Sequence, residues 1–377
     1  MTGFTTKIKA LSAIGIADIS GSGISALFWF YVASILEPSQ YGEISYFLSI
    51  SLLTANVALL GAANTLVVYT AKNIKIQASL YFMTLIAGLV ASAIIFFIFY
   101  NIGASILVIG YLIFTLVTSE LLGRKLFKNY SKYVILQKIL MVVFSLVLYY
   151  LFGQNGILIG MGLSFAPYVI GIVKGFKNSK IEFQLIKERS NFIINSYAQS
   201  ILGALGSSLD KLIIVPVVGF TLLGNYALGL QYYNLMLIIP TIVMKFLLPE
   251  DSIGIDNKKL KYLTILFAGV LTVIGLTIGP MVMSSIFPKF EEVHDVIQII
   301  SLSLIPSVVV MMYHTKFLGS EKSRKALTSS LIGSITQISG IIVLGNMYGI
   351  IGVSFALVLA SINAAIYSLF ADKYEKL

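Results

Sequence analysis

The stretch ASLYFMTLIAGLVASAIIFFIFY, residues 78–100, decides the fold class of this chain. It contains no charged residue, and about twenty apolar residues are enough for a helix to cross the hydrocarbon core of a bilayer. A strand of a membrane β-barrel would alternate apolar and polar residues over about ten positions, whereas this run is apolar on every face. Because a helix pairs its backbone groups internally, as lipid demands, we predict a transmembrane helix here.

The composition of the whole chain extends this prediction beyond one segment. Of the 377 residues, 58% are hydrophobic and 11% are charged, while soluble globular domains carry about 25% charged residues. The chain has no cysteine, so disulfides and thiolate metal sites are excluded. We predict an all-α integral membrane protein that is not an enzyme, with no catalytic site, no metal site and no cofactor.

Apolar runs of spanning length follow one another along the chain, separated by clusters of charge, proline, glycine or asparagine. The twelve runs cover residues 10–36, 41–71, 77–100, 103–123, 133–152, 156–174, 191–218, 222–248, 260–286, 296–318, 326–344 and 350–370. Lysine and arginine near span ends collect on the cytoplasmic side, and with the N-terminus inside, 21 of the 26 basic residues lie on inner segments. We therefore predict about twelve transmembrane helices in the cytoplasmic membrane, with both termini cytoplasmic. The net charge of +10 then faces anionic lipid rather than nucleic acid.

The longest polar stretch divides the chain into two halves of six runs each. We predict an N-terminal lobe at residues 1–175, a cytoplasmic amphipathic connector at 176–190 on the membrane surface, and a C-terminal lobe at 191–377. A regulatory or partner-docking role for the connector stays open. Six spans starting from the same side in each half indicate parallel repeats. Two pairs of similar segments support duplication: residues 36–46 with 218–228, and residues 155–160 with 348–352.

A family resemblance rests on residues in these repeated segments. They are Leu36, Pro38, Tyr41 and Gly42 in the first half, and Asp210, Leu223, Gly224, Tyr226 and Leu228 in the second. With the six-plus-six topology and the basic connector, they make the chain resemble the multidrug/oligosaccharidyl-lipid/polysaccharide (MOP) exporter superfamily. Within that superfamily, the chain looks like the Wzx-type flippases of lipid-linked polysaccharide precursors. The resemblance implies two six-helix lobes around a central cavity that opens alternately to either side of the membrane.

Polar residues inside the spans are the candidates for a functional site, because an intramembrane charge costs about 2.5 to 3.5 kcal/mol on insertion scales and needs a partner or water. In the first span, small and polar residues share one face at Gly15, Asp18, Ser22, Ser25 and Trp29. In the seventh span the same spacing joins Asn195, Gln199, Gly203, Gly206 and Asp210, with Ser207 and Lys211 beside them. The alternatives are tight packing of small residues, a structural carboxylate at Asp18, and a local Asp210–Lys211 ion pair.

A second group of candidates is cationic. Lys245, His314 and Lys316 fall toward the predicted inner ends of two spans, where they could attract the pyrophosphate of a lipid-linked sugar. Long side chains at such positions also reach the headgroups without any ligand. We predict eight substrate-binding residues in all: Asp18, Asn195, Gln199, Asp210, Lys211, Lys245, His314 and Lys316. Glu120 and Arg124, four residues apart, are expected to pair with each other.

The leading functional hypothesis is a flippase that moves a polyprenyl-linked oligosaccharide across the membrane by alternating access. The expected partners are this substrate, membrane lipids and a proton or sodium ion as the coupling ion, without nucleic acid and with a monomer favoured. A cation-coupled multidrug exporter of MATE type is the nearest alternative, with Asp18 or Asp210 as its carboxylate. A membrane-embedded glycosyltransferase or polymerase would need an acidic metal site, and residues 291–295 are the only acidic cluster in the predicted outer loops. The connecting segments contain no phosphate-binding glycine-rich loop. A structural scaffold is the last alternative.

Overall fold

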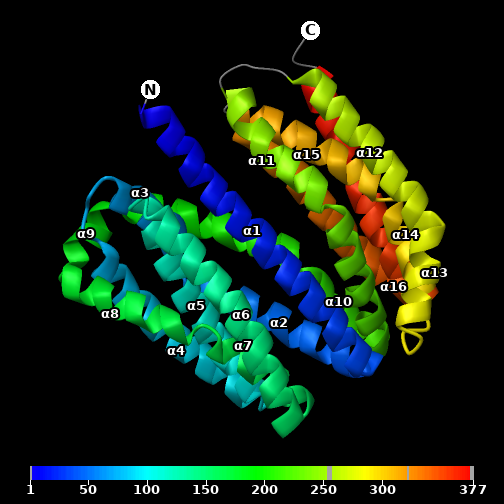
Figure 1. Cartoon of the computed structure of the whole chain (residues 1–377), viewed down its shortest axis with the longest axis horizontal. Helices are drawn as coiled ribbons and strands as arrows, with labels where there is room; N and C mark the ends of the chain where they lie inside the picture. The colour runs from blue at the N-terminus through cyan, green and yellow to red at the C-terminus, as the bar shows by residue number, and fades with distance from the viewer. Residues whose placement is uncertain (1, 253–256, 321, 374–377) are drawn as a thin grey trace. The chain divides into compact units, whose positions relative to one another are not determined.

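The computed structural model describes residues 2–252, 257–320 and 322–373, with side chains not described for 2–14, 16–18, 202, 205–207, 249 and 252. All regular structure in this described part is helical (Figure 1). The helices are α1 (Thr2–Ile35), α2 (Pro38–Ala58), α3 (Ala62–Ala71), α4 (Gln77–Phe99), α5 (Ile102–Gly123), α6 (Phe127–Phe152), α7 (Gln154–Leu163), η1 (Ala166–Tyr168), α8 (Val169–Asn178), α9 (Phe183–Glu188), α10 (Ser190–Met236), α11 (Ile238–Ser252), α12 (Lys258–Leu276), α13 (Ile278–Ile286), α14 (Val293–Ser301), α15 (Leu304–Gly319) and α16 (Ser323–Lys373).

The helices confirm the predicted class, an all-α multi-pass membrane protein. Among the described residues, seven helices are individually long and apolar enough to cross a bilayer, and two bent pairs raise the number to nine. Glycines divide the two longest helices: Gly219 (φ 83°) interrupts α10, and Gly349 (φ 58°) interrupts α16. With these divisions and the shorter apolar helices, the described chain agrees with about twelve spans.

Several predicted spans contain a break in the helix. Span 2 bends by 52° between α2 and α3 at Leu60 and Gly61, which both have positive φ. In the second half, Pro240, Pro280 and Pro306 are each the third residue of the helix that follows a break, in α11, α13 and α15. Proline lacks a backbone N–H and is tolerated in the first turn of a helix. The three prolines therefore mark helix breaks.

Contacts divide the chain into two units, whose bounds differ from the predicted lobes. Unit 1 contains Met1–Phe28 and Phe47–Ser208, and unit 2 contains Trp29–Tyr46 and Leu209–Leu377. The differences are residues 29–46, which group with the C-terminal helices, and residues 191–208, which group with the N-terminal ones. The two lobes with a connector between them stay a prediction.

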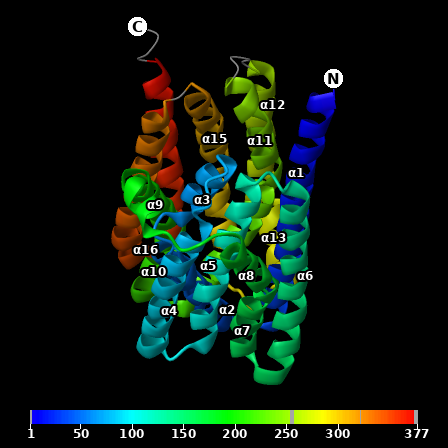
Figure 2. The ribbon, with the colours of Figure 1, turned by 90° about the vertical axis from the view of Figure 1, so that its left-hand side faces the viewer.

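Unit 1 is a bundle in which α5 lies against α3, α4 and α7, and α7 lies against α6 (Figure 2). Its buried polar centre is Glu120, which accepts a hydrogen bond from the Tyr81 hydroxyl and forms an ion pair with Arg124 at 2.7 Å. The predicted Glu120–Arg124 pair is therefore confirmed, and Tyr81 completes it.

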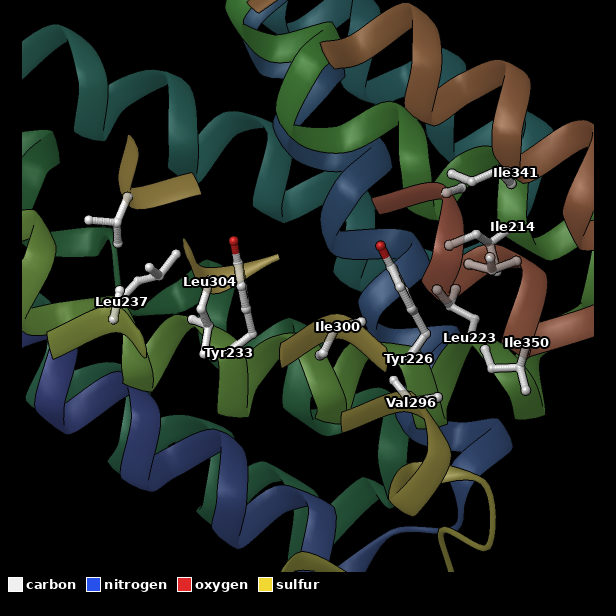
Figure 3. Packing of buried hydrophobic residues seen from close by; sticks show 14 of the residues in the cluster. Ile214, Leu223, Tyr226, Tyr233, Leu237, Val296, Ile300, Leu304, Ile341 and Ile350 are labelled. Atoms are coloured by element: carbon white, nitrogen blue, oxygen red, sulfur yellow. The ribbon is translucent and has the colours of Figure 1, made fainter. Parts of the chain in front are cut away.

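Unit 2 has an apolar core built from α10, α11, α12, α14, α15 and α16. Tyr226 and Tyr233 rise from α10 in the same direction among Leu223, Ile300 and Leu304 (Figure 3). The Tyr233 hydroxyl donates a hydrogen bond to Ser307 Oγ over 2.7 Å. A polar group in such a core needs a partner, because an unpaired one is costly to bury.

The two units share one local arrangement. A Cβ on Gly156 would meet the backbone carbonyl of Leu148, and a Cβ on Gly352 would meet that of Leu344. Each pair lies eight residues apart, and each glycine follows a positive-φ glycine, Gly153 or Gly349, by three residues. This repeated helical hairpin supports the duplication predicted from residues 155–160 and 348–352.

Candidate functional site

A polar groove of unit 1 lies where the second half of span 2 packs on the start of α10. It has a volume of about 270 Å³ and is lined by Asn64, Val67, Val68, Phe192, Asn195, Ser196 and Gln199. The first three come from α3 and the others from α10. We call this the amide groove, because three carboxamides and one hydroxyl line it.

Gly61 explains why the amide groove forms. With φ 79°, it occupies the left-handed region that glycine adopts readily, and it starts α3 at an angle to α2. A Cβ at this position would lie 2.5 Å from the carbonyl oxygen of Ile193 and 2.8 Å from the amide nitrogen of Tyr197. Glycine is needed twice, for the backbone conformation and for the close approach of α3 to α10.

Two cations lie beside the groove on an aromatic platform. The Tyr69 ring makes an edge contact with the groove residue Phe192, with 5.4 Å between ring centroids. Arg189 Cζ is 5.2 Å and Lys72 Nζ is 5.7 Å from the centroid of Tyr69. Arg189 also donates hydrogen bonds to Leu185 O and to Glu188 Oε2, each at 3.0 Å, and the second is an ion pair that balances part of its charge.

The chemistry of this arrangement suits a neutral, hydroxyl-rich ligand with an anionic neighbour. A carboxamide both donates and accepts hydrogen bonds, as sugar hydroxyls require. None of the residues that line the groove is acidic, and the guanidinium and ammonium groups around Tyr69 favour an anion such as phosphate. A cationic ligand would find no carboxylate among the lining residues.

The predicted site residues are distributed over both units. Asn195 and Gln199 lie together in the amide groove, both exposed. Asp18 is in α1, and its side chain lies outside the described residues. Asp210 and Lys211 form an ion pair at 3.3 Å, which is the local pairing that was the alternative to a substrate contact.

The three cationic candidates occupy unit 2. Lys316 Nζ pairs with Asp372 Oδ1 at 2.5 Å, so its charge is balanced by α16. His314 Nε2 is buried and has no hydrogen-bond partner among the described residues. Lys245 is exposed on α11. An anion subsite made of these three residues stays a prediction, and the acidic partner of Lys316 weighs against its part in it.

The sequence analysis missed the polar groove residues Asn64 and Ser196 and the apolar ones Val67, Val68 and Phe192. Residues 41–71 read as one continuous span, which hides the break at Leu60–Gly61 and places Asn64 in mid-helix. The only local signal is the sequence Leu60-Gly-Ala-Ala-Asn64, since a glycine followed by small residues and asparagine weakens a helix. Within the described chain, no group of three or more His, Asp or Glu residues could hold a metal ion.

Comparison with known proteins places this architecture among membrane transporters. No family model matches the chain, and no curated protein sequence matches it. The fold is similar to lipid II flippase MurJ in an inward closed conformation, with TM-score 0.75 and 16% identity over 96% of this chain and 87% of that one.

Two further solved structures are similar over almost the whole chain. One is a multidrug resistance MATE family transporter of the MOP superfamily in an inward-facing conformation, with TM-score 0.72 and 14% identity over 97% of this chain and 98% of that one. The other is a MOP superfamily transporter from Pyrococcus furiosus, with TM-score 0.65 and 15% identity over 97% and 95%. The predicted resemblance is thereby confirmed at the level of the fold: this chain has the architecture of the MOP transporters.

Proposed function

We propose that the chain is a flippase of the cytoplasmic membrane that carries a polyprenyl-linked oligosaccharide from the inner to the outer leaflet by alternating access. It performs no covalent chemistry. The observation that carries this proposal is the amide groove, which a break in span 2 opens against α10. Its lining offers amides and a hydroxyl without an acid, and two cations stand beside it.

Broken helices support a substrate site at this position. Irregular backbone at membrane depth is tolerated only where it is buried in protein or lines a water-filled cavity, and transporters build their sites from such discontinuous helices. The break at Leu60–Gly61 is followed within four residues by Asn64, which lines the groove. With both termini cytoplasmic, α10 begins on the inner side, directly after the connector. The groove then faces the leaflet in which a lipid-linked sugar is assembled.

The charge of the site favours this substrate over a cationic drug. Sugar hydroxyls fit the carboxamides of Asn64, Asn195 and Gln199, while the phosphates of the carrier link fit Lys72 and Arg189. One similar structure is a lipid II flippase, and the resemblance to Wzx-type flippases points to the same substrate class.

Flipping in proteoliposomes tests the proposal. A fluorescent polyprenyl-linked oligosaccharide is incorporated into vesicles with the protein, and its exposure to an external lectin or quencher is followed. The double variant Asn195→Ala, Gln199→Ala should flip at least about tenfold more slowly, since each lost hydrogen bond weakens binding by about 1 kcal/mol. Asn346→Ala, which removes an exposed amide of α16 outside the groove, is the matched control. An unchanged flipping rate in the double variant would show that the substrate does not bind in the amide groove during transport.

A cation-coupled multidrug exporter is the second candidate. One of the similar structures is a multidrug resistance transporter of the MOP superfamily, and another is a MOP transporter whose description names no lipid-linked sugar. Asp210 is its best carboxylate, although the ion pair with Lys211 already balances that charge. Proton- or sodium-driven efflux of a cationic dye from vesicles, abolished in Asp210→Asn, would support this candidate. The same vesicles flipping an oligosaccharide lipid without any ion gradient would oppose it.

A further inference from the structure

The connector, residues 176–190, is bound to the first turn of α4 by reciprocal hydrogen bonds. Ser79 Oγ donates to the carbonyl oxygen of Glu182 over 3.1 Å and accepts from the backbone N–H of Glu182 over 2.8 Å. The backbone N–H of Ala78 donates to Ser179 Oγ over 3.1 Å. Ser79 is fully buried, so separating the connector from α4 would leave its hydroxyl group without these partners, which is unfavourable.

Tyr81 continues this contact into the interior of unit 1. Its side chain is fully buried, and a Cβ on Gly175 of α8 would collide with its ring. The Phe176 ring makes an edge contact with the same ring, with 6.0 Å between centroids. The Tyr81 hydroxyl donates a hydrogen bond to Glu120, whose other carboxylate oxygen pairs with Arg124. Tyr81 therefore links the end of α8 to a buried carboxylate of α5.

α5 connects this carboxylate to the wall of the amide groove. Gly123 is the last residue of α5 and lies three residues after Glu120, so the two are neighbours on the helix surface. A Cβ on Gly123 would collide with Thr70 Oγ1 and lie 2.6 Å from the carbonyl oxygen of Val67, which lines the amide groove. Because closely packed interiors transmit small displacements, a movement of the end of α5 would move this wall.

The other end of the connector reaches α3 directly. Arg189 lies over the Tyr69 ring of α3, and Tyr69 contacts the groove residue Phe192. α3 has only ten residues, and a helix of that length is marginal on its own. Its position therefore depends on the helices and side chains packed against it, and contacts lead to it from both ends of the connector.

We propose that the connector positions the α3 wall of the amide groove, and that Tyr81 and Glu120 are positioning residues for the substrate that binds there. Neither residue lines the groove, and both are buried. They act through the contact of Gly123 with Val67. The identity of the substrate rests on the proposed function, whereas the position of α3 can be measured without any ligand.

A single cysteine on the groove wall tests the position of α3, because the chain has no native cysteine. Val68 lines the groove and is half-buried, so Val68→Cys places a thiol there. In this background, Tyr81→Phe keeps the ring packed on Gly175 and removes only the hydrogen bond to Glu120. A water-soluble maleimide should then label the thiol at least about threefold faster, the effect of losing one hydrogen bond of ordinary strength.

Ser79→Ala is the second variant and acts on the connector itself. It removes both hydrogen bonds to Glu182 and leaves Tyr81 in place, so we expect a similar rise in the labelling rate. Ser145→Ala is the matched control, because Ser145 is also fully buried and donates to the carbonyl oxygen of Ile157 over 3.2 Å, between α6 and α7. The labelling rate in Ser145→Ala should equal that of the background protein.

A second control makes the tyrosine change elsewhere in unit 1. Tyr168 is fully buried, and its hydroxyl has no hydrogen-bond partner among the described residues. Tyr168→Phe should therefore leave the labelling rate unchanged. All variants are compared at a temperature at which each keeps the circular dichroism spectrum of the background protein, so that differences in labelling do not reflect unfolding.

Binding of a labelled oligosaccharide lipid in nanodiscs separates positioning from a merely structural role. Tyr81→Phe and Ser79→Ala should bind it at least about threefold more weakly than Ser145→Ala does. Unchanged labelling in both variants, an equal rise in Ser145→Ala, or unchanged affinity for a lipid that the parent binds would each overturn the positioning role. If labelling rises as expected and even the parent binds no oligosaccharide lipid, the proposed function fails and the position of α3 still depends on the connector.

Discussion

Span 2 and α10 meet at two places, and the two contacts have opposite chemistry. In unit 1, Gly61 brings α3 onto the first turns of α10 and leaves a groove lined by amides. In unit 2, Gly42 and Gly224 bring the two helices into backbone contact, and aromatic rings seal the surroundings. The absence of a Cβ serves both contacts. The contacts differ in the side chains around each glycine. Polar side chains leave a groove at Gly61, whereas aromatic side chains pack closely around Gly42 and Gly224.

The largest effect is expected at Gly61, because two requirements coincide there. Gly61→Ala places a Cβ in the left-handed region and against the backbone of Ile193 and Tyr197. Backbone strain and overpacking each cost about 1–3 kcal/mol. We expect a loss of about 3 kcal/mol in stability, measured as a lower melting temperature in detergent or nanodiscs. Transport should fall with it.

Gly203→Ala is the control for this prediction, since α10 has open space at that position. Alanine is the better helix former by about 1 kcal/mol, so this variant should be as stable as the parent or slightly more stable. If Gly61→Ala melts at the parent temperature, the break in span 2 does not depend on glycine, and the comparison with the Gly42–Gly224 contact fails.

A smaller effect is expected at Asp210, which lies on α10 between the groove residues and Gly224. The Asp210 and Lys211 side chains are 11% and 22% exposed and pair at 3.3 Å. Removing one partner of a fully buried pair costs about 3–5 kcal/mol, and partial exposure reduces this to about 1–2 kcal/mol. Asp210→Asn should lower the melting temperature by that amount without changing transport per folded molecule. Normal stability with lost transport would instead make Asp210 a coupling or substrate residue.

Much of the fold could be predicted from the sequence, because lipid leaves few choices. Apolar runs such as residues 77–100 must be helices, and the lysines and arginines between them indicate the number of spans. From the sequence alone, Pro240, Pro280 and Pro306 indicate breaks, because a proline inside a helix removes a backbone hydrogen bond. The break at Gly61 is not indicated in this way, because glycine within an apolar run is common and only the contact of its Cα with α10 shows why it is there.

The site could be predicted only in part. The helical spacing of Asn195 and Gln199 places them on one face, and the structure brings them into the amide groove. Their partner Asn64 is 131 residues away along the chain, and no local pattern links them. Similarly, the resemblance of residues 36–46 to 218–228 can be recognised in the sequence. The reciprocal contact of Gly42 with Gly224 cannot, because it depends on tertiary packing.

The break in span 2 gives a third prediction, on ligand binding rather than stability. Asn64→Ala removes one carboxamide from the amide groove and leaves Gly61 in place. The expected loss is one hydrogen bond of about 1 kcal/mol, or about fivefold in substrate affinity, measured by binding of a labelled oligosaccharide lipid in nanodiscs. Asn129→Ala, an exposed amide of α6, is the control. Equal affinities for the two variants would place the sugar outside the groove.

The smallest effect is expected at the ion pair beside the crossing of Gly42 with Gly224, and its size distinguishes the pair from the glycines. Glu37→Gln removes the exposed ion pair with Lys289, which contributes at most about 1 kcal/mol. At low salt the melting temperature should therefore fall only slightly. In 1 M potassium chloride the difference from the parent should vanish, because the screening length falls to about 3 Å. Reversing the pair with Glu37→Lys and Lys289→Glu should restore the parent value. If Glu37→Gln lowered the melting temperature as much as Gly42→Ala does, at every salt concentration, the ion pair and not the glycine crossing would hold these helices together.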